Sequence, residues 1–313
     1  MKRIALLGAT SHVAKNLIFE NYSNHRWDLS LFARNPDRIR AFLTELGLPQ
    51  DAEPLGAFTN TTETFDAVIN CVGFGTPQKV RAAQESLFTV AEEIDRYIFA
   101  HLRRNPQTKY LNFSSGAVYG SALESPIQRG ALSSIALSPM DDTDSYRVSK
   151  IYQEAKHRSW KDFSVVDIRL FNFFSRFIDQ DGGYLMTDVL RALKAGTPLK
   201  TSSQEIYRDY IAPSDLFRFV DKIVEGGTLN AALDTFSAKP ISKSELLESL
   251  KREFGLKVEL SDGGKASPTG VKPYYYSNDK GARAITGYVP QKTSWDGIFD
   301  ELSALGLVPR LAH

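Results

Sequence analysis

The sequence predicts an α/β protein with a doubly wound parallel sheet and a smaller C-terminal lobe. Through the first half of the chain, unbroken apolar runs of strand length alternate with longer helical patterns. Strands that are apolar on both faces are typical of a parallel sheet covered by helices on both sides. Beyond Phe171 this alternation becomes irregular. We therefore expect a boundary between two lobes near residue 171.

The expected strands of the first lobe are the apolar runs at residues 3–8, 29–33, 67–71, 109–113 and 164–170. Helices are expected between them, over residues 13–20, 36–46, 80–98 and 146–160. In the longest of these, apolar residues recur every three or four positions, as on one face of a helix. The second half predicts helices over 188–195, 214–225, 242–254 and 294–305. Residues 262–276 are rich in Gly, Pro, Ser and Tyr and are expected to form a surface loop.

The composition of the 313 residues, with 42% hydrophobic and 24% charged, is typical of a soluble globular protein. The net charge of +1 argues against nucleic acid as the main partner. No apolar run approaches the ~18 residues of a membrane span. The apolar stretch at the N-terminus ends already at Gly8, so this stretch predicts a buried strand and not an export signal. The single cysteine, Cys71, favours a reducing compartment, so we expect a cytoplasmic protein. The histidines are scattered, and no metal site is expected.

Residues 8–14, Gly-Ala-Thr-Ser-His-Val-Ala, lie between the first expected strand and the first helix. A Rossmann-type fold places a cofactor diphosphate there, against small residues and the free N–H groups of the helix. In the usual Gly-x-x-Gly-x-x-Gly/Ala pattern, Ser11 replaces the middle glycine. The alternative is an ordinary strand-to-helix turn. The loop residues expected to bind the cofactor are Gly8, Thr10, Ser11, His12 and Val13.

The second strand ends in Ala33-Arg34. A carboxylate at this place would bind the adenosine ribose hydroxyls and favour NAD, whereas an arginine can pair with a 2′-phosphate. The sequence therefore favours NADP, with NAD as the alternative, although Arg34 can also be a solvated charge. After the third strand, Cys71, Val72 and Gly73 begin a glycine-containing loop that we expect beside the cofactor.

Tyr146 and Lys150 are four residues apart and share one helix face. A lysine ammonium stabilises a nearby phenolate, so the tyrosine can exchange a proton with a substrate oxygen. The same spacing occurs at Tyr152/Lys156 and at Tyr276/Lys280, but Tyr146 starts a helix between two core strands. Ser115, at the end of the preceding strand, is placed to bind the reacting carbonyl or alcohol.

Together these motifs resemble the extended short-chain dehydrogenase/reductase family of nucleotide-sugar epimerases, dehydratases and ketoreductases. The matching segments are Ser-Gly-Ala-Val-Tyr-Gly at 115–120, Tyr-Arg-Val-Ser-Lys at 146–150, Arg-Leu-Phe-Asn at 169–172, Arg-Asp-Tyr-Ile at 208–211 and Ile-Thr-Gly-Tyr-Val-Pro at 285–290. After 208–211, Ala212 and Pro213 stand where the family usually has histidine and valine. The resemblance covers nearly the whole chain.

The resemblance implies that Ser115, Tyr146 and Lys150 are catalytic. Tyr146, Lys150, Phe171 and Asn172 would also contact the cofactor. The substrate would be bound by Ser115, Gly116, Asn172 and Arg208. The resemblance further implies an NADP-binding Rossmann domain over residues 1–171, to which residues 209–240 return, a mostly substrate-binding lobe over 172–313, and a homodimer.

The type of reaction is inferred from Gly116 and Ala117 and from the preferred cofactor. Gly116 and Ala117 replace the Asp-Glu pair of family 4,6-dehydratases, which disfavours elimination of water. The preference for NADP favours a ketoreductase acting on a nucleotide-linked 4-keto-6-deoxy sugar, and an epimerase with bound NAD is the alternative. A non-catalytic NADP-sensing regulator or scaffold is a third possibility, against which the intact Tyr146 and Lys150 argue. The three tyrosines at 274–276 are expected to anchor a loop and not to stack on substrate.

Overall fold

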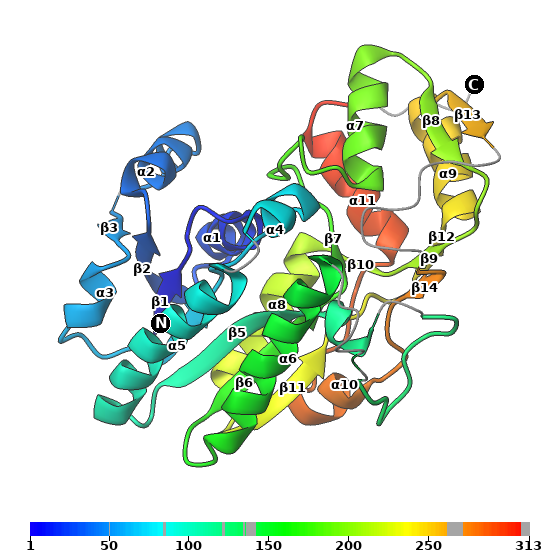
Figure 1. The fold of residues 1–313 in the computed structure, drawn as a ribbon. Coiled ribbons are helices and arrows are strands. Elements are labelled where there is room, and N and C mark those ends of the chain that lie inside the picture. Colours follow the sequence, from blue (N-terminus) through cyan, green and yellow to red (C-terminus); the bar gives the residue numbers. More distant parts are fainter. Residues whose placement is uncertain are drawn as a thin grey trace.

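The computed structural model describes residues 1–49, 51–83, 86–120, 123–133, 135, 142–261 and 272–307. Its centre is a seven-stranded parallel sheet with the strand order β11-β6-β5-β4-β1-β2-β3 (Figure 1). The strands are β1 (Lys2–Leu7), β2 (Trp27–Ala33), β3 (Glu53–Pro54), β4 (Ala67–Asn70), β5 (Lys109–Ser115), β6 (Val165–Leu170) and β11 (Asn230–Asp234). The predicted doubly wound α/β fold is confirmed.

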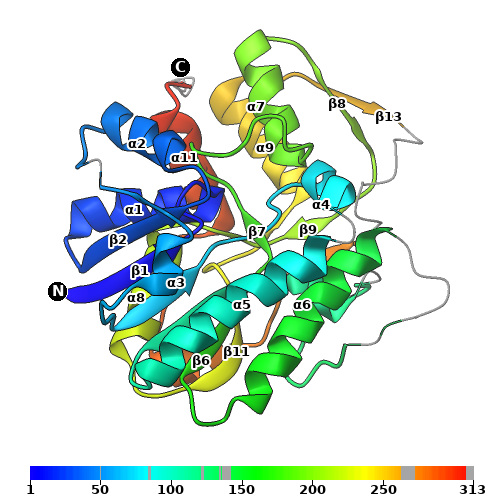
Figure 2. The same cartoon turned by 60° about the vertical axis from the view of Figure 1, so that its left-hand side comes forward.

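The strands are apolar on both faces because each face packs against helices. In β1, Ile4 and Leu6 point into one core, while Ala5 and Leu7 point into another. The first core is closed by α1 (His12–Asn24), α2 (Pro36–Glu45) and α8 (Pro213–Glu225). The opposite face is covered by α3 (Ala57–Asn60), α5 (Ser86–Arg104) and α6 (Asp142–Ser159), of which α5 and α6 lie side by side (Figure 2).

Most expected elements of the first lobe lie within a few residues of their observed bounds. One long helix was expected over residues 80–98, and the described residues there are helical, in α4 (Pro77–Ala83) and α5. Residues 84–85 lie outside the described residues. In the part of the chain that the structure describes, no helix combines the length and apolarity needed to cross a bilayer.

The second lobe has its own core, built on α7 (Leu185–Ala195), α9 (Lys243–Phe254) and α11 (Ser294–Ala304). Short strands between these helices form three small sheets. In the first, β8 (Leu199–Ser202) pairs with β13 (Val258–Ser261), and in the second, β7 (Asn172–Phe173) pairs with β10 (Tyr210–Ile211). In the third, β9 (Tyr207–Arg208) pairs with both β12 (Ile241–Ser242) and β14 (Tyr274–Tyr275). A short helix, α10 (Gly281–Thr286), packs near β11. The prediction of a loop over residues 262–276 is wrong at Tyr274–Tyr275, which form β14. Residues 262–271 lie outside the described residues. The division of the chain into two domains stays a prediction.

Candidate active site

The loop after β1 touches the loop after β4. Gly8 has a φ of +76°, and a Cβ at this position would lie 2.7 Å from Val72 N and 2.8 Å from the Cys71 carbonyl carbon. Only glycine meets both demands without strain. The amides of Gly8 and Ala9 donate to the Phe32 carbonyl at 2.9 and 3.1 Å, which ties the same loop to β2. Two of the segments expected to bind the cofactor thus meet at backbone distance.

Ser11 replaces the expected glycine without backbone strain, because its φ of −72° and ψ of 157° are ordinary extended values. Its hydroxyl accepts from Ala14 N at 3.2 Å and caps α1. The first amides of the helix, those of His12 and Val13, have no acceptor within the helix. The Ser11 hydroxyl therefore accepts from one amide at the N-terminus of α1, that of Ala14. The amides of His12 and Val13 remain available to a ligand.

His12 joins the loop after β1 to the segment that follows β7. Its Nε2 lies 2.7 Å from Ser175 Oγ, and that oxygen already accepts from Asn16 Nδ2 at 2.9 Å and from Phe177 N at 3.2 Å. The serine proton is therefore donated to Nε2, which places the imidazole proton on Nδ1. Burial, together with the charge of Lys15, lowers the pKa of His12 to about 3. His12 is a neutral side chain fixed in one tautomer.

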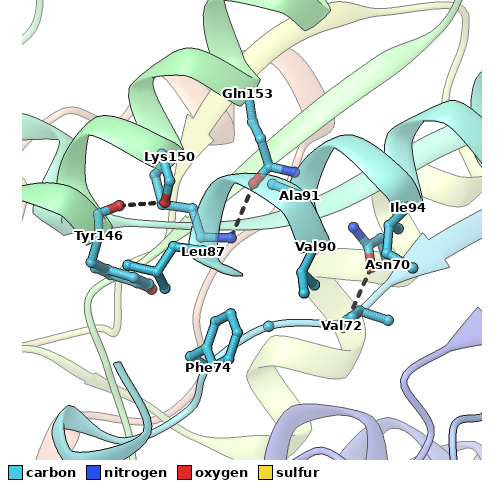
Figure 3. Close-up of a pocket in the computed structure, with 12 residues that line it drawn as sticks. Asn70, Val72, Phe74, Leu87, Val90, Ala91, Ile94, Tyr146, Lys150 and Gln153 are labelled. Atoms are coloured by element: carbon cyan, nitrogen blue, oxygen red, sulfur yellow. Dashed lines mark hydrogen bonds between the residues drawn. The ribbon is translucent and has the colours of Figure 1, made fainter. Parts of the chain in front are cut away.

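The predicted catalytic residues lie where β5 ends and α6 begins. Lys150 Nζ donates to Phe113 O at 3.1 Å and to Gln153 Oε1 at 3.3 Å. Figure 3 shows Tyr146 and Lys150 on one side of a small open pocket. Asn70 at the end of β4, the loop residues Val72, Gly73 and Phe74, and residues of α5 form further walls. The Tyr/Lys pair and the loop after β4 thus share one pocket.

Ser115 has a neighbour that the sequence did not indicate. Its Oγ accepts from Ala117 N at 3.1 Å and lies 3.3 Å from the hydroxyl of Tyr275. Tyr275 reaches this position because β14 pairs with β9, and because Asn172 Nδ2 donates to its carbonyl at 3.1 Å. Burial raises the pKa of Tyr275 to about 12, so its hydroxyl is protonated. The expectation that this tyrosine only anchors a loop missed its contact with Ser115.

Gly116 and Phe171 pack directly against each other. A Cβ on Gly116 would lie 2.4 Å from the Phe171 ring. The ring also contacts Tyr275, with centroids 5.3 Å apart. Gly116 and Asn172, which the sequence assigned to the substrate, and Phe171, which it assigned to the cofactor, therefore surround the contact between Ser115 and Tyr275.

The two predicted arginines lie at separate places. Arg34 is exposed between the end of β2 and the start of α2. Arg208, on β9, donates from Nη1 to the carbonyls of Tyr207 at 2.9 Å and Lys272 at 2.8 Å, and its guanidinium carbon lies 5.9 Å from the centre of the Tyr275 ring. Arg208 also lines a hollow in the second lobe with Lys243.

The competing Tyr152/Lys156 pair lies elsewhere on α6. Tyr152 is exposed, and Lys156 Nζ pairs with Glu92 Oε2 at 2.8 Å. Within the described ranges, no group of three His, Cys, Asp or Glu side chains is arranged to hold a metal ion.

Solved structures with this fold include nucleotide-sugar enzymes. UDP-glucose 4-epimerase from Brucella ovis, in complex with NAD, superposes with a TM-score of 0.77 at 17% identity, covering 99% of this chain and 100% of that chain. UDP-glucose-4-epimerase from Stenotrophomonas maltophila, with bound NAD and formylated UDP-arabinopyranose, gives a TM-score of 0.81 at 12% identity over 98% and 99% of the two chains. RMD from Pseudomonas aeruginosa, complexed with NADPH, gives 0.75 at 19% identity over 97% of each chain.

No curated protein gives a significant match to the sequence. The sequence profile of the NAD dependent epimerase/dehydratase family matches residues 7–232, which is most of the chain and includes the loop at Gly8, Ser115, Tyr146 and Lys150. The chain therefore belongs to the NAD dependent epimerase/dehydratase family.

Proposed function

We propose that the protein is an NADP-dependent ketoreductase acting on a nucleotide-linked 4-keto-6-deoxy sugar. The observation that carries this proposal is the end of β2, where Arg34 is exposed and neither it nor Ala33 is acidic. An exposed guanidinium can pair with the 2′-phosphate of NADP, whereas neither side chain at these two positions can accept hydrogen bonds from the ribose hydroxyls of NAD. The fold itself does not decide, since related structures hold NAD or NADPH.

The residues present fit a dinucleotide. Gly8 lets the first loop approach the backbone of Cys71 and Val72, and a Cβ at Gly73 would meet nothing within 4 Å. The amides of His12 and Val13 offer donors and the positive end of α1 to a diphosphate. The remaining proposed contacts are Thr10, Ser11, Tyr146, Lys150, Phe171 and Asn172. When bound, the reduced cofactor supplies the hydride.

The proton chemistry falls to three side chains. Tyr146 donates a proton to the oxygen of the reduced carbonyl, and Ser115 holds that oxygen by a hydrogen bond. Lys150 uses two of its three ammonium hydrogens on Phe113 O and Gln153 Oε1. The third is left for the cofactor ribose or Tyr146, and its positive charge stabilises the phenolate after proton transfer.

The substrate would lie between these residues and the second lobe. We assign its sugar to the surroundings of Ser115, Gly116 and Asn172, and its diphosphate to Arg208. Burial lowers the pKa of Arg208, but an arginine remains charged at neutral pH. Gly116 and Ala117 offer no group for proton transfer, so elimination of water is not expected.

An epimerase with bound NAD is the second candidate, because it uses the same three side chains and the fold also carries NAD-bound epimerases. The regulator hypothesis is weaker, because Tyr146 and Lys150 line an open pocket together. We also propose a homodimer formed through α5 and α6, the two long helices on one face of the sheet. The molar mass from light scattering tests it, and a mass of one chain would refute it.

Calorimetric titration of NADPH and NADH into the wild type and Arg34→Ala tests the cofactor preference. Loss of a charge-assisted hydrogen bond of ~1.5–3 kcal/mol predicts that the variant binds NADPH at least about tenfold more weakly, with NADH unchanged. Arg252→Ala, an exposed arginine on α9, is the control and should change neither affinity. Equal affinity of the wild type for both cofactors would overturn the use of Arg34. Oxidation of NADPH with a panel of keto sugars then separates reductase from epimerase and regulator.

A further inference from the structure

A closed ring of buried polar side chains lies under the pocket, between the sheet and helices α5 and α6. None of its members is more than 2% exposed. The members, in the order of their hydrogen bonds, are Asn70, Tyr110, Asp95, His157, Asp167 and Asn112. Buried polar groups are costly unless all are satisfied, so a ring of this size needs an explanation.

His157 is held between two carboxylates. Its Nδ1 lies 2.8 Å from Asp167 Oδ1 and its Nε2 lies 3.2 Å from Asp95 Oδ1. Carboxylate oxygens only accept, so both ring nitrogens donate and the imidazole carries a positive charge. Burial alone would lower the pKa of His157, but the hydrogen bonds to Asp167 and Asp95 outweigh it and raise the pKa to about 9.

The other charged groups around His157 come from α5 and α6. Arg158 Nη2 donates to Asp167 Oδ2 at 2.7 Å, and Lys156 Nζ lies 3.5 Å from Asp95 Oδ2 and 2.8 Å from Glu92 Oε2. From β5, the hydroxyl of Tyr110 donates to Asp95 Oδ1 at 2.9 Å. Asp95 and Asp167 are therefore each paired with a second basic side chain besides His157.

Two arms run from this charged centre to Asn70, at the end of β4. On one arm, Asn70 Nδ2 donates to the Tyr110 hydroxyl at 3.2 Å, which in turn donates to Asp95. On the other, Asn70 Nδ2 donates to Asn112 Oδ1 at 3.1 Å, and Asn112 Nδ2 donates to Asp167 at 2.7 Å. Both amide hydrogens of Asn70 are thus used inside the ring.

With Nδ2 fixed, Asn70 Oδ1 can face only outward, where it accepts from Val72 N at 2.9 Å. Val72 N is the same atom that leaves no room for a Cβ on Gly8. A small movement of this amide would therefore change how the two loops meet. Asn70 also lines the pocket that contains Tyr146 and Lys150.

We propose that His157 is a positioning residue for the cofactor loop: with Asp95 and Asp167 it orients the Asn70 amide, which holds Val72 N against the loop at Gly8. The inference rests on the proposed function in so far as this loop binds the dinucleotide. His157 lies on the opposite face of the sheet from α1. On this inference it nevertheless contributes to cofactor affinity.

The test uses Tyr110→Phe, which removes one arm and keeps the ring shape. Tyr288→Phe is the matched control, because it also deletes a buried hydroxyl, one that donates to Phe236 O at 3.4 Å away from the loop. Hydrogen exchange of residues 70–75 is measured in the cofactor-free proteins, and NADPH and NADH are then titrated. We expect Tyr110→Phe to exchange about fivefold faster and to bind cofactor about fivefold more weakly, for a lost hydrogen bond of ~1 kcal/mol, while the control matches the wild type.

A second variant, His157→Gln, tests the charge, since a glutamine side chain is neutral and does not titrate. Protection of residues 70–75 against hydrogen exchange is corrected for the pH dependence of the intrinsic exchange rate. In the wild type, this protection should fall as pH rises through about 9, where the raised pKa of His157 lies. In His157→Gln, it should be independent of pH. Wild-type exchange in Tyr110→Phe, or the same alkaline loss in His157→Gln, would overturn the positioning role. Failure of the wild type to bind either cofactor would refute the proposed function, but the exchange measurement would still decide this inference.

Discussion

Gly8→Ala tests the contact between the loop after β1 and the loop after β4. Gly8 and Gly47 both have positive φ, +76° and +66°, but a Cβ at Gly8 would lie 2.7–2.9 Å from the backbone of Cys71 and Val72, whereas one at Gly47 would meet nothing within 4 Å. Forcing alanine into the left-handed region costs ~1–2 kcal/mol at either site. Replacing glycine by alanine also lowers the conformational entropy of the unfolded chain, by about the same amount in both variants. Gly8→Ala alone adds the overpacking cost of ~1–3 kcal/mol, because backbone atoms cannot move aside as a flexible side chain does.

Urea unfolding of both variants isolates that second cost as their difference in the free energy of unfolding. We expect Gly8→Ala to be less stable than Gly47→Ala by ~1–3 kcal/mol, and to bind NADPH more weakly because the amide of Val72 is displaced. Gly47→Ala should bind NADPH as the wild type does. Equal stability losses in the two variants would refute the argument that close approach, and not backbone conformation, requires glycine at position 8.

Three further predictions concern single side chains. Tyr146→Phe should reduce turnover of a keto sugar at least ~100-fold while NADPH still binds in calorimetry, because only the proton donor is lost; substantial remaining turnover would exclude Tyr146 as the donor. Tyr275→Phe should lower kcat about fivefold by freeing the Ser115 hydroxyl, with little change in Tm; an unchanged kcat and KM would show that the 3.3 Å contact has no role in turnover. The pKa of His157, about 9, lies above its unfolded value of 6.5, so its contribution to stability is complete below pH 6.5 and is lost as pH rises through about 9; urea midpoints that do not fall there would contradict its buried charge.

The elements that the sequence predicted well are those with a strong local signal. The five strands of the central sheet that were predicted contain apolar runs, because helices cover both faces, and such runs are visible without knowledge of the fold. Helix ends were also close where a cap is present: α9 begins after Ser242, whose hydroxyl accepts from Glu245 N at 3.1 Å.

The short strands of the second lobe have no such signal, because tertiary pairing creates them. β14 consists of Tyr274–Tyr275 and exists because it pairs with β9, distant in the chain. The contact between Tyr275 and Ser115 depends on that pairing and could not be predicted locally. The ring around His157 was missed for another reason: its members are polar residues of helices and strands, and a polar residue in an amphipathic pattern usually indicates a solvated face.

The place of β11 in the sheet has a consequence for the order in which the chain folds. β11 pairs in parallel with β6, and Asp234 at its end accepts from the Tyr119 hydroxyl at 2.9 Å, yet much of the second lobe lies between β6 and β11 in the chain. During synthesis, β6 therefore stays an open edge until residue 234 has left the ribosome, with unpaired backbone groups that another chain can join. A fragment that ends at residue 171 would carry that edge permanently, so we expect it to aggregate, whereas a fragment reaching past residue 234 can close the sheet.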